Sequence, residues 1–371
     1  MNRAFKMIKK QLLNKQSNFY SLRKLITLFW AAVSILSCSA SPRQIDDSLQ
    51  SWQTFDQKFM VLAEKRSFLA GEIVEQDCTT IHAIDAEQSL AVGSSFKLYI
   101  LAELAHQIAT QNIPVENASR GGEAYLSWDT LLAIQPEYKS IPGGALLFVP
   151  DNTQYTVRYY AEQMIQRSDN TATDHLLYLL GRENVEQRMQ LTGHHDPALN
   201  IPLLATREFA ALKFLYSDAE LAAYLAKSTA NKRLVLDNEQ RGYQELESYF
   251  VQNGEQSAPL HINTIEWFAN RFDMCHVLMS LYSTAKAENM RPVTEIMSLE
   301  DKLDIDREQW VYVGFKGGSE FGVLAGNWLL QRNDGRLFVI SFALNNEPGA
   351  IETQSVIPVL KSAVELLERT P

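Results

Sequence analysis

Strand-like segments at the two ends of the sequence enclose a long helical region, and this arrangement limits the folds open to the chain. Apolar and polar residues alternate over residues 67–74 and 79–84, with a turn between them. Strand patterns return in 310–315, 322–331 and 336–344, and Asn333-Asp334-Gly335 before the last of these is typical of a hairpin. We therefore expect one antiparallel sheet built from both ends of the chain.

Helical spacing of apolar residues predicts helices over 45–66 and 351–368, and the first of these is expected to pack on one face of the sheet. Between the strands, helices are expected over 94–108, 157–167 and 172–180, and 205–290 is expected to be mainly helical, with the sequence pattern least informative in the polar stretch 231–259. The Gly- and Pro-rich segment 117–152 is expected to form loops over the site. The predicted class is α+β, with residues 39–93 and 301–371 forming one subdomain and 94–300 a helical one.

The chain has 371 residues, of which 46% are hydrophobic, so it can bury a large core. Its formal net charge is −10, although residues 1–37 contain only basic charged residues: Arg3, Lys6, Lys9, Lys10, Lys15, Arg23 and Lys24. The remainder is therefore more acidic than the chain as a whole. An acidic body argues against binding to nucleic acid.

The N-terminus has the pattern of an export signal: a basic leader, an apolar run from Leu25 to Leu36, and small residues around Cys38. The run is too short to span a bilayer comfortably. Ile35-Leu36-Ser37-Cys38 resembles a bacterial lipobox, which implies lipidation of Cys38 after cleavage at residue 38. Cleavage after Ala40 and an uncleaved anchor are the alternatives. All three place the body outside the cytoplasm, and we expect a periplasmic, membrane-anchored lipoprotein.

Two cysteines, Cys78 and Cys275, remain after the leader. In an oxidising compartment they could pair, and two buried free thiols are the alternative. No Cys-x-x-Cys motif or Cys/His cluster indicates a metal, and the adjacent His194 and His195 have no matching ligand set. We therefore expect neither a metal nor another cofactor.

Ser94-Ser95-Phe96-Lys97 opens an apolar helical segment after Gly93. Residues three apart on a helix lie side by side, so this spacing places the Ser94 hydroxyl beside the Lys97 amine. A lysine whose charge is disfavoured can accept the proton of a nucleophilic serine. The pattern alone is weak evidence, because Ser21-x-x-Lys24 and Ser283-x-x-Lys286 match it too.

Two further motifs follow Ser94 in order: Ser168-Asp169-Asn170, and Lys316-Gly317-Gly318-Ser319 on a predicted strand. Singly, the first could be a helix-capping turn and the second a plain strand end. Together, over roughly residues 45–371, the three motifs resemble those of penicillin-recognising serine hydrolases, and most of all class A serine β-lactamases. The resemblance implies a five-stranded antiparallel sheet flanked by helices, beside an inserted all-helical subdomain.

The resemblance also implies a role for each residue. Ser94 would attack the lactam carbonyl, with Lys97 as its general base or proton relay. Ser168 would pass a proton to the leaving nitrogen. The substrate would be bound by Asn170, Lys316, Gly318 and Ser319, and the backbone N–H groups of Ser94 and Ser319 would form the oxyanion hole. Asp169 is expected to hold its loop through hydrogen bonds to the backbone.

Two departures from the family pattern bear on substrate and turnover. Gly317 has no hydroxyl where the family has Thr or Ser, and Ser319 is expected to replace it in part. The family's Glu-Pro-x-Leu-Asn loop, which supplies the deacylation base, appears here as Asp196-Pro197-Ala198-Leu199-Asn200. Asp196 is therefore the candidate base, although its side chain is one methylene shorter, and a turn-forming Asp-Pro without chemistry is the alternative.

These features lead us to expect an exported, monomeric serine β-lactamase that opens a β-lactam or related acyl substrate through an acyl-enzyme on Ser94. One alternative is a related serine hydrolase, an esterase or a D-Ala-D-Ala peptidase. The other is a penicillin-binding sensor that is acylated without turnover.

Overall fold

The computed structural model describes residues 51–371, except 118–121, 240, 255 and 257. The predicted leader with Cys38 lies outside these residues. Asp47–Pro371 forms one compact unit. Among the described helices, none is both long and apolar enough to cross a membrane.

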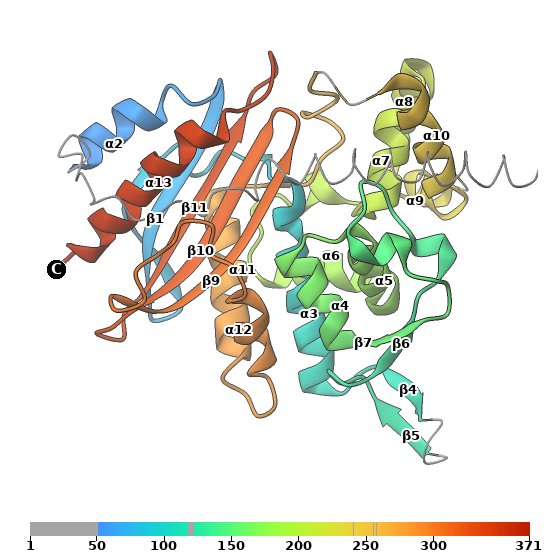
Figure 1. The fold of residues 1–371 in the computed structure, drawn as a ribbon, viewed down its shortest axis with the longest axis horizontal. Helices are drawn as coiled ribbons and strands as arrows, with labels where there is room; N and C mark the ends of the chain where they lie inside the picture. Colours follow the sequence, from blue (N-terminus) through green and yellow to red (C-terminus); the bar gives the residue numbers. More distant parts are fainter. Residues whose placement is uncertain (1–50, 118–121, 240, 255, 257) are drawn as a thin grey trace, which may run out of the picture. The chain divides into compact units, whose positions relative to one another are not determined.

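A five-stranded antiparallel sheet joins the two ends of this unit, as predicted (Figure 1). The strand order is β2-β1-β11-β10-β9. Because β1 pairs with β11 along its length, with Phe68 opposite Phe342, the first strands of the sheet lie beside the last. The strands are β1 (Lys65–Val74), β2 (Asp77–Ile84), β9 (Trp310–Glu320), β10 (Val323–Arg332) and β11 (Leu337–Asn345).

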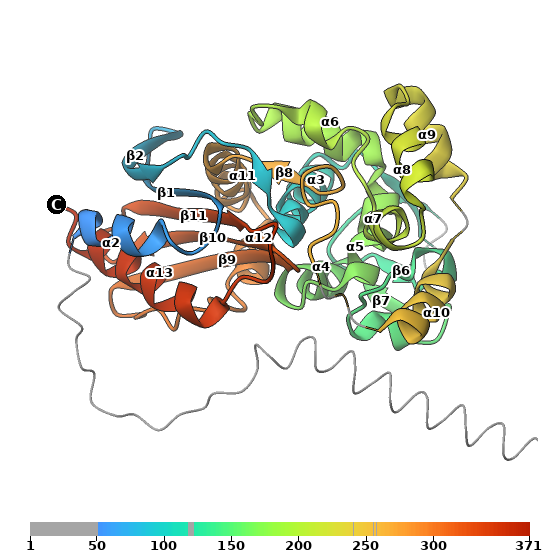
Figure 2. The ribbon, with the colours of Figure 1, turned by 90° about the horizontal axis from the view of Figure 1, so that it is seen from above.

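Helices cover both faces of the sheet. Figure 2 shows α2 (Trp52–Phe59) and α13 (Thr353–Glu368) on one face and α11 (Arg271–Thr284) on the other. Adjacent residues of a strand point to opposite faces. Phe68 accordingly packs with the core beneath α2 and α13, and Leu69 with the core that contains α11. Both faces are buried, which explains the nearly continuous apolar runs of β10 and β11.

The predicted helix over 45–66 is wrong in its extent. The observed helix α2 begins at Trp52 and ends at Phe59, and residues 45–50 lie outside the described part of the chain. Lys65 and Arg66 instead belong to β1, where they pair with Asn345 and Leu344. The hydrogen bonds of the sheet override the local helical spacing, which continued through Leu62 and Ala63.

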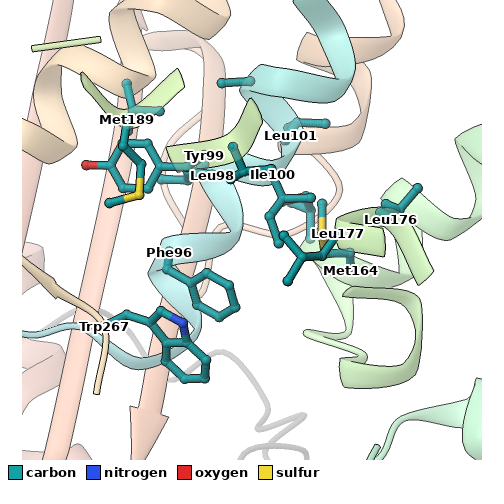
Figure 3. Packing of buried hydrophobic residues seen from close by; sticks show 14 of the residues in the cluster. Phe96, Leu98, Tyr99, Ile100, Leu101, Met164, Leu176, Leu177, Met189 and Trp267 are labelled. Atoms are coloured by element: carbon teal, nitrogen blue, oxygen red, sulfur yellow. The ribbon is translucent and has the colours of Figure 1, made fainter. Parts of the chain in front are cut away.

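The central chain is mainly helical, as expected, and α3 lies in its core. Every residue from Lys97 to Ala105 is buried, which fixes the start of this helix beside the sheet (Figure 3). The polar stretch 231–259, where the sequence pattern was least informative, contains most of one helix and all of another. The helices of this region are α3 (Lys97–Thr110), α4 (Val157–Gln166), α5 (Asn170–Leu180), α6 (Arg182–Leu191), α7 (Thr206–Phe214), α8 (Asp218–Leu225), α9 (Thr229–Asp237), α10 (Tyr243–Asn253) and α12 (Pro292–Met297).

Segment 117–152 is more regular than the predicted loops, because it contributes to two small antiparallel sheets and two short 3₁₀ helices. The first sheet pairs β4 (Pro114–Asn117) with β5 (Gly122–Tyr125), and the second pairs β6 (Leu131–Ala133) with β7 (Gln154–Thr156). The 3₁₀ helices are η3 (Pro136–Tyr138) and η4 (Ala145–Phe148). The subdomain boundaries at residues 93 and 300 remain predictions. Helix α11 falls within 94–300, the range assigned to the helical subdomain, but it packs on the sheet.

Cys78 and Cys275 form a disulfide across 197 positions, which decides between the two alternatives for these thiols. The bond ties β2 to α11, and so fixes the helix on its face of the sheet. A disulfide contributes about 2–4 kcal/mol to stability in typical cases, chiefly by constraining the unfolded chain.

Candidate active site

Ser94 lies on the 3₁₀ helix η2 (Gly93–Phe96), directly before α3. Gly93 has a φ of +48°, in the left-handed region that favours glycine. A Cβ atom there would also lie 3.1 Å from the Ser319 backbone nitrogen. Glycine therefore lets β9 approach the backbone that carries the nucleophile. The Ser94 hydroxyl is half-buried and, among the described residues, has no hydrogen-bond partner.

Lys97 follows one helical turn later, and its ammonium group is completely buried. Its Nζ atom donates hydrogen bonds to the Ser168 carbonyl oxygen at 2.7 Å and to Asn170 Oδ1 at 2.6 Å, and lies 3.2 Å from Ser168 Oγ. Burial lowers the pKa of Lys97 to about 7, against the opposing charges of Asp169 and Asp174. Lys97 is therefore partly neutral near pH 7, and the neutral amine is the form that accepts a proton.

Ser168 lies between the two lysines of the site. Its Oγ atom is 3.2 Å from Lys97 Nζ and 3.1 Å from Lys316 Nζ, so a lysine of α3 and a lysine of β9 meet at one hydroxyl. Its φ is +56°, an unusual value for a residue with a side chain. Backbone strain of this kind costs about 1–3 kcal/mol and persists where the surroundings impose it. Here it directs the hydroxyl toward both ammonium groups.

The two residues after Ser168 hold this turn in place. Asp169 is completely buried and caps α5: its carboxylate accepts hydrogen bonds from the Ala172 N–H at 2.9 Å and the Leu146 N–H at 3.0 Å. This is the loop-holding role expected from the sequence. Asn170 donates from Nδ2 to the Pro142 carbonyl oxygen at 2.8 Å, which fixes the orientation of its amide.

Lys316 enters the site from β9, and its side chain is buried. It donates to Ser168 Oγ and to the Gly317 carbonyl oxygen, the latter at 2.6 Å. Burial, and after it the charges of Lys97 and Lys302, hold its pKa well below the usual range for lysine. A carboxylate bound here would relieve that repulsion, so the position suits an anionic group of a substrate.

The backbones of β9 and η2 are in close contact around the nucleophile. A Cβ atom at Gly318 would lie 2.6 Å from the Ser94 nitrogen and 2.0 Å from the Val92 carbonyl oxygen, so this residue has to be glycine. Ser319 is exposed directly beyond it. The N–H of Ser94 lies in the first turn of a helix, where such groups have no acceptor within the helix. Ser94 and Ser319 thus present their amides from two adjacent segments.

Asn327, on β10 opposite Lys316, is a site residue that sequence analysis missed. Its buried amide donates to Ser95 Oγ at 2.9 Å and to the Lys316 carbonyl oxygen at 3.1 Å, and accepts from Ser341 Oγ at 2.8 Å. It joins the strand of Lys316 to the turn of Ser94. A polar residue within the apolar run of β10 was the only signal in the sequence.

Among the described residues, no hydrogen bond joins Asp196 to this cluster. Among the described residues, its carboxylate has no hydrogen-bond partner, and the acidic groups whose charges raise the pKa of Lys97 are Asp169 and Asp174. The following loop is anchored elsewhere, because Asn200 donates to the Phe268 carbonyl oxygen and accepts from its N–H, both at 2.8 Å. The role of Asp196 as deacylation base therefore remains a prediction.

The site has the parts that nucleophilic acyl transfer needs. It combines a hydroxyl without a competing partner, an amine with a pKa near 7, a second hydroxyl between two amines, and two adjacent backbone N–H groups. Hydrogen bonds join Lys97, Ser168, Asn170 and Lys316, which come from α3, the α4–α5 turn and β9. The backbone of Ser94 on η2 lies against Gly318, two residues after Lys316 on the same strand.

Comparison with known proteins relates the chain to β-lactamases. The β-lactamase enzyme family model matches residues 70–243. Similar solved structures include a variant of PBP-A as an acyl-enzyme complex with penicillin G, which is 13% identical, with 89% of this chain and 100% of that chain covered and a TM-score of 0.53. A β-lactamase from Sphaerobacter thermophilus is 15% identical, with 85% and 96% covered and a TM-score of 0.55. A β-lactamase from Chitinophaga pinensis is 11% identical, with 85% and 97% covered and a TM-score of 0.54.

No curated protein sequence matches the chain significantly. At these identities the solved structures establish the fold, which is that of β-lactamases and transpeptidases. The resemblance to class A serine β-lactamases and penicillin-recognising serine enzymes is thereby confirmed.

Proposed function

We propose that the protein is an exported serine β-lactamase. The Ser94 oxygen attacks the lactam carbonyl carbon while its proton passes to the neutral Lys97 amine. The carbon–nitrogen bond then breaks, and Ser168 gives its proton to the leaving nitrogen and recovers one from Lys97. Water finally hydrolyses the ester on Ser94, which releases the ring-opened acid and regenerates the hydroxyl.

One observation carries this proposal: the Ser168 hydroxyl lies within 3.2 Å of both Lys97 Nζ and Lys316 Nζ. A proton can pass from Lys97 through Ser168, while Lys316 holds a substrate carboxylate nearby. The first lysine then serves the chemistry and the second serves binding, which suits a bicyclic β-lactam with a carboxylate close to its ring nitrogen.

The test is to mix the purified protein with a penicillin and to follow ring opening and intact mass together. We expect ring opening in excess of enzyme, with a transient mass increase equal to the whole penicillin. Neither an adduct nor ring opening, combined with activity on esters or D-Ala-D-Ala peptides, would contradict the proposal and favour the related hydrolase.

A penicillin-binding protein with slow turnover is the second candidate, and it is favoured because the Asp196 carboxylate has no hydrogen bond to the described residues of the site. Without a base near the ester, water attacks slowly and the acyl-enzyme persists. Hydrogen bonds in an unliganded active site often tighten only when substrate binds, so Asp196 keeps its proposed role in the first candidate. The two candidates differ in the lifetime of the adduct.

The Asp196→Ala variant tests this role. If Asp196 activates the deacylating water, the adduct lifetime should increase about 100-fold, with no change in the rate of its formation. Time-resolved mass spectrometry after removal of excess penicillin measures the lifetime, with Asp218→Ala as the control at an exposed aspartate outside the site. An unchanged lifetime would exclude Asp196 from deacylation and favour the second candidate.

We further propose that the protein is exported and anchored to the membrane through lipidated Cys38. The Cys78–Cys275 disulfide supports export, because disulfides persist in oxidising compartments.

The Cys38→Ala variant should lose fatty-acid labelling and move from the membrane fraction to the soluble fraction, because it has no thiol to acylate. Fractionation and labelling of cells that express each form measure this, with Ser34→Ala as a control in the leader that keeps the Cys38 thiol. A wild-type protein that is soluble and unlabelled would contradict the anchor and favour cleavage after Ala40.

A further inference from the structure

Lys213 on α7 is a buried lysine that the acyl-transfer mechanism does not use. Its side chain is completely buried, and its Nζ atom lies 3.1 Å from Glu266 Oε1 and in close contact with Glu320 Oε1. Glu266 is also buried, and Glu320 is nearly so. Burying charge is costly unless it is well paired, so such a cluster ties three separate segments together firmly.

The carboxylates of this cluster belong to segments next to the nucleophile. Glu320 is the last residue of β9 and directly follows Ser319. Glu266 accepts a hydrogen bond at Oε2 from the N–H of Trp267 at 3.1 Å. The carbonyl oxygen of Trp267 accepts in turn from the N–H of Val92, two residues before Ser94, at 2.8 Å.

Aromatic stacking gives α7 a second connection to the nucleophile. Phe209 lies one turn before Lys213 on α7, and the Lys213 ammonium group is 4.4 Å from the centre of the Phe209 ring. Phe209 stacks on Trp267 with ring centres 4.4 Å apart, and Trp267 stacks on Phe96 at 4.0 Å and an interplanar angle of 6°. Figure 3 shows the Trp267 and Phe96 rings together at the start of α3. Phe96 is two residues after Ser94.

We propose that helix α7 positions the oxyanion hole, with Lys213 holding β9 at Ser319 through Glu320, and Phe209 holding η2 at Ser94 through Trp267 and Phe96. This inference rests on the proposed function. The N–H groups of Ser94 and Ser319 come from different segments, η2 and β9. Helix α7 contacts residues that hold each of these segments in place. Lys213, Glu320 and Phe209 are positioning residues, because none of them contacts the reacting atoms.

The charges of Lys213, Glu266 and Glu320 are consistent with a cluster that holds β9 in place. Burial, and after it the neighbouring Glu266 carboxylate, hold the pKa of Glu320 well above its usual range. The uncharged form of Glu320 is therefore favoured beside the Lys213–Glu266 ion pair.

The principal variant is Glu320→Ala, which removes the connection to β9 but leaves Lys213 paired with Glu266. We expect the acylation rate constant with a penicillin to fall about 10- to 100-fold at an unchanged apparent binding constant, because the donors act in the transition state. Glu320→Gln keeps an acceptor for Lys213 and should restore most of the rate. Lys213→Met should behave like Glu320→Ala.

Glu239→Ala is the matched control, because Glu239 also pairs a largely buried carboxylate with a cation, Arg241. Glu239 takes no part in the contacts of α7 with β9 and η2, so the acylation rate of the Glu239→Ala variant should equal that of the wild type. Thermal unfolding of each variant shows whether the comparison is between folded proteins. Wild-type acylation rates in folded Glu320→Ala and Lys213→Met would overturn the proposal.

Amide hydrogen exchange provides a readout that needs no β-lactam. Peptides covering residues 316–322 should exchange faster in Glu320→Ala than in wild type or Glu239→Ala, and unchanged exchange would also overturn the proposal. If no penicillin acylates the wild-type protein, the proposed function fails, whereas the exchange result still decides whether the cluster holds β9.

Discussion

The Ser94→Ala variant is expected to open β-lactam rings about 10⁴-fold more slowly than the wild type, or slower still, and to form no covalent adduct. The reason is chemical: the ester can form only on this hydroxyl, whereas Ser168, the other hydroxyl beside the lysines, is placed to relay protons. Removing the oxygen leaves the fold intact, because Ser94 makes no side-chain hydrogen bond among the described residues. Ring opening and intact mass measure both effects.

Ser283→Ala is the control for this variant. Ser283 and Lys286 repeat the Ser-x-x-Lys spacing at the end of α11, where Ser283 is exposed and the Lys286 ammonium lies 4.9 Å from the ring centre of Tyr282. The same spacing without the surrounding site should contribute nothing to activity. Adduct formation or ring opening that survives in Ser94→Ala would show that another residue is the nucleophile.

Replacing Lys97 by arginine is expected to lower the acylation rate about 10²- to 10⁴-fold, the usual contribution of a general base. Arginine keeps the positive charge but does not lose its proton in this pH range, so it cannot accept one from Ser94. In the wild type, burial lowers the pKa of Lys97 to about 7, and the neutral amine is populated as the pH rises through that value. The acylation rate should therefore rise about tenfold per pH unit below pH 7 and level off above it.

Stopped-flow acylation between pH 5 and pH 9 measures this profile, with Lys286→Arg as the control. The lowered pKa of Lys316 adds a separate effect: where a rising pH removes its charge, binding of the substrate carboxylate weakens, so the apparent binding constant changes rather than the rate constant. A flat acylation rate across this range, or full activity of Lys97→Arg, would contradict the role of Lys97 as base.

Sequence reasoning succeeded where the relevant information is local. Alternation along the strands and the Asp334-Gly335 turn predicted β10 and β11, and the motif order led to the residues that meet at the Ser168 hydroxyl. Periodicity failed at residues 60–66, because pairing with β11 determines where β1 begins. The apolar spacing of these residues favours a helix, but Lys65 and Arg66 pair with β11 and adopt strand structure.

The supports of the site could not be read from the sequence. Lys213 is separated from Glu266 by 53 positions and from Glu320 by 107, and nothing near any of them indicates that they meet. The Cys78–Cys275 pairing and the contacts of Asn327 also arise only when the sheet and helices pack together. Asp196 is a different case, because its short motif was recognisable in the sequence but its carboxylate has no hydrogen-bond partner among the described residues.

The most direct test of the account is to locate the site of acylation. The protein is mixed with a penicillin, quenched in acid within the lifetime of the adduct, digested, and its peptides are sequenced by mass spectrometry. We predict a mass increase equal to the whole penicillin on Ser94 alone. The same increase on any other residue, or none at every quench time while rings are opened, would contradict the claim that this hydroxyl is the nucleophile.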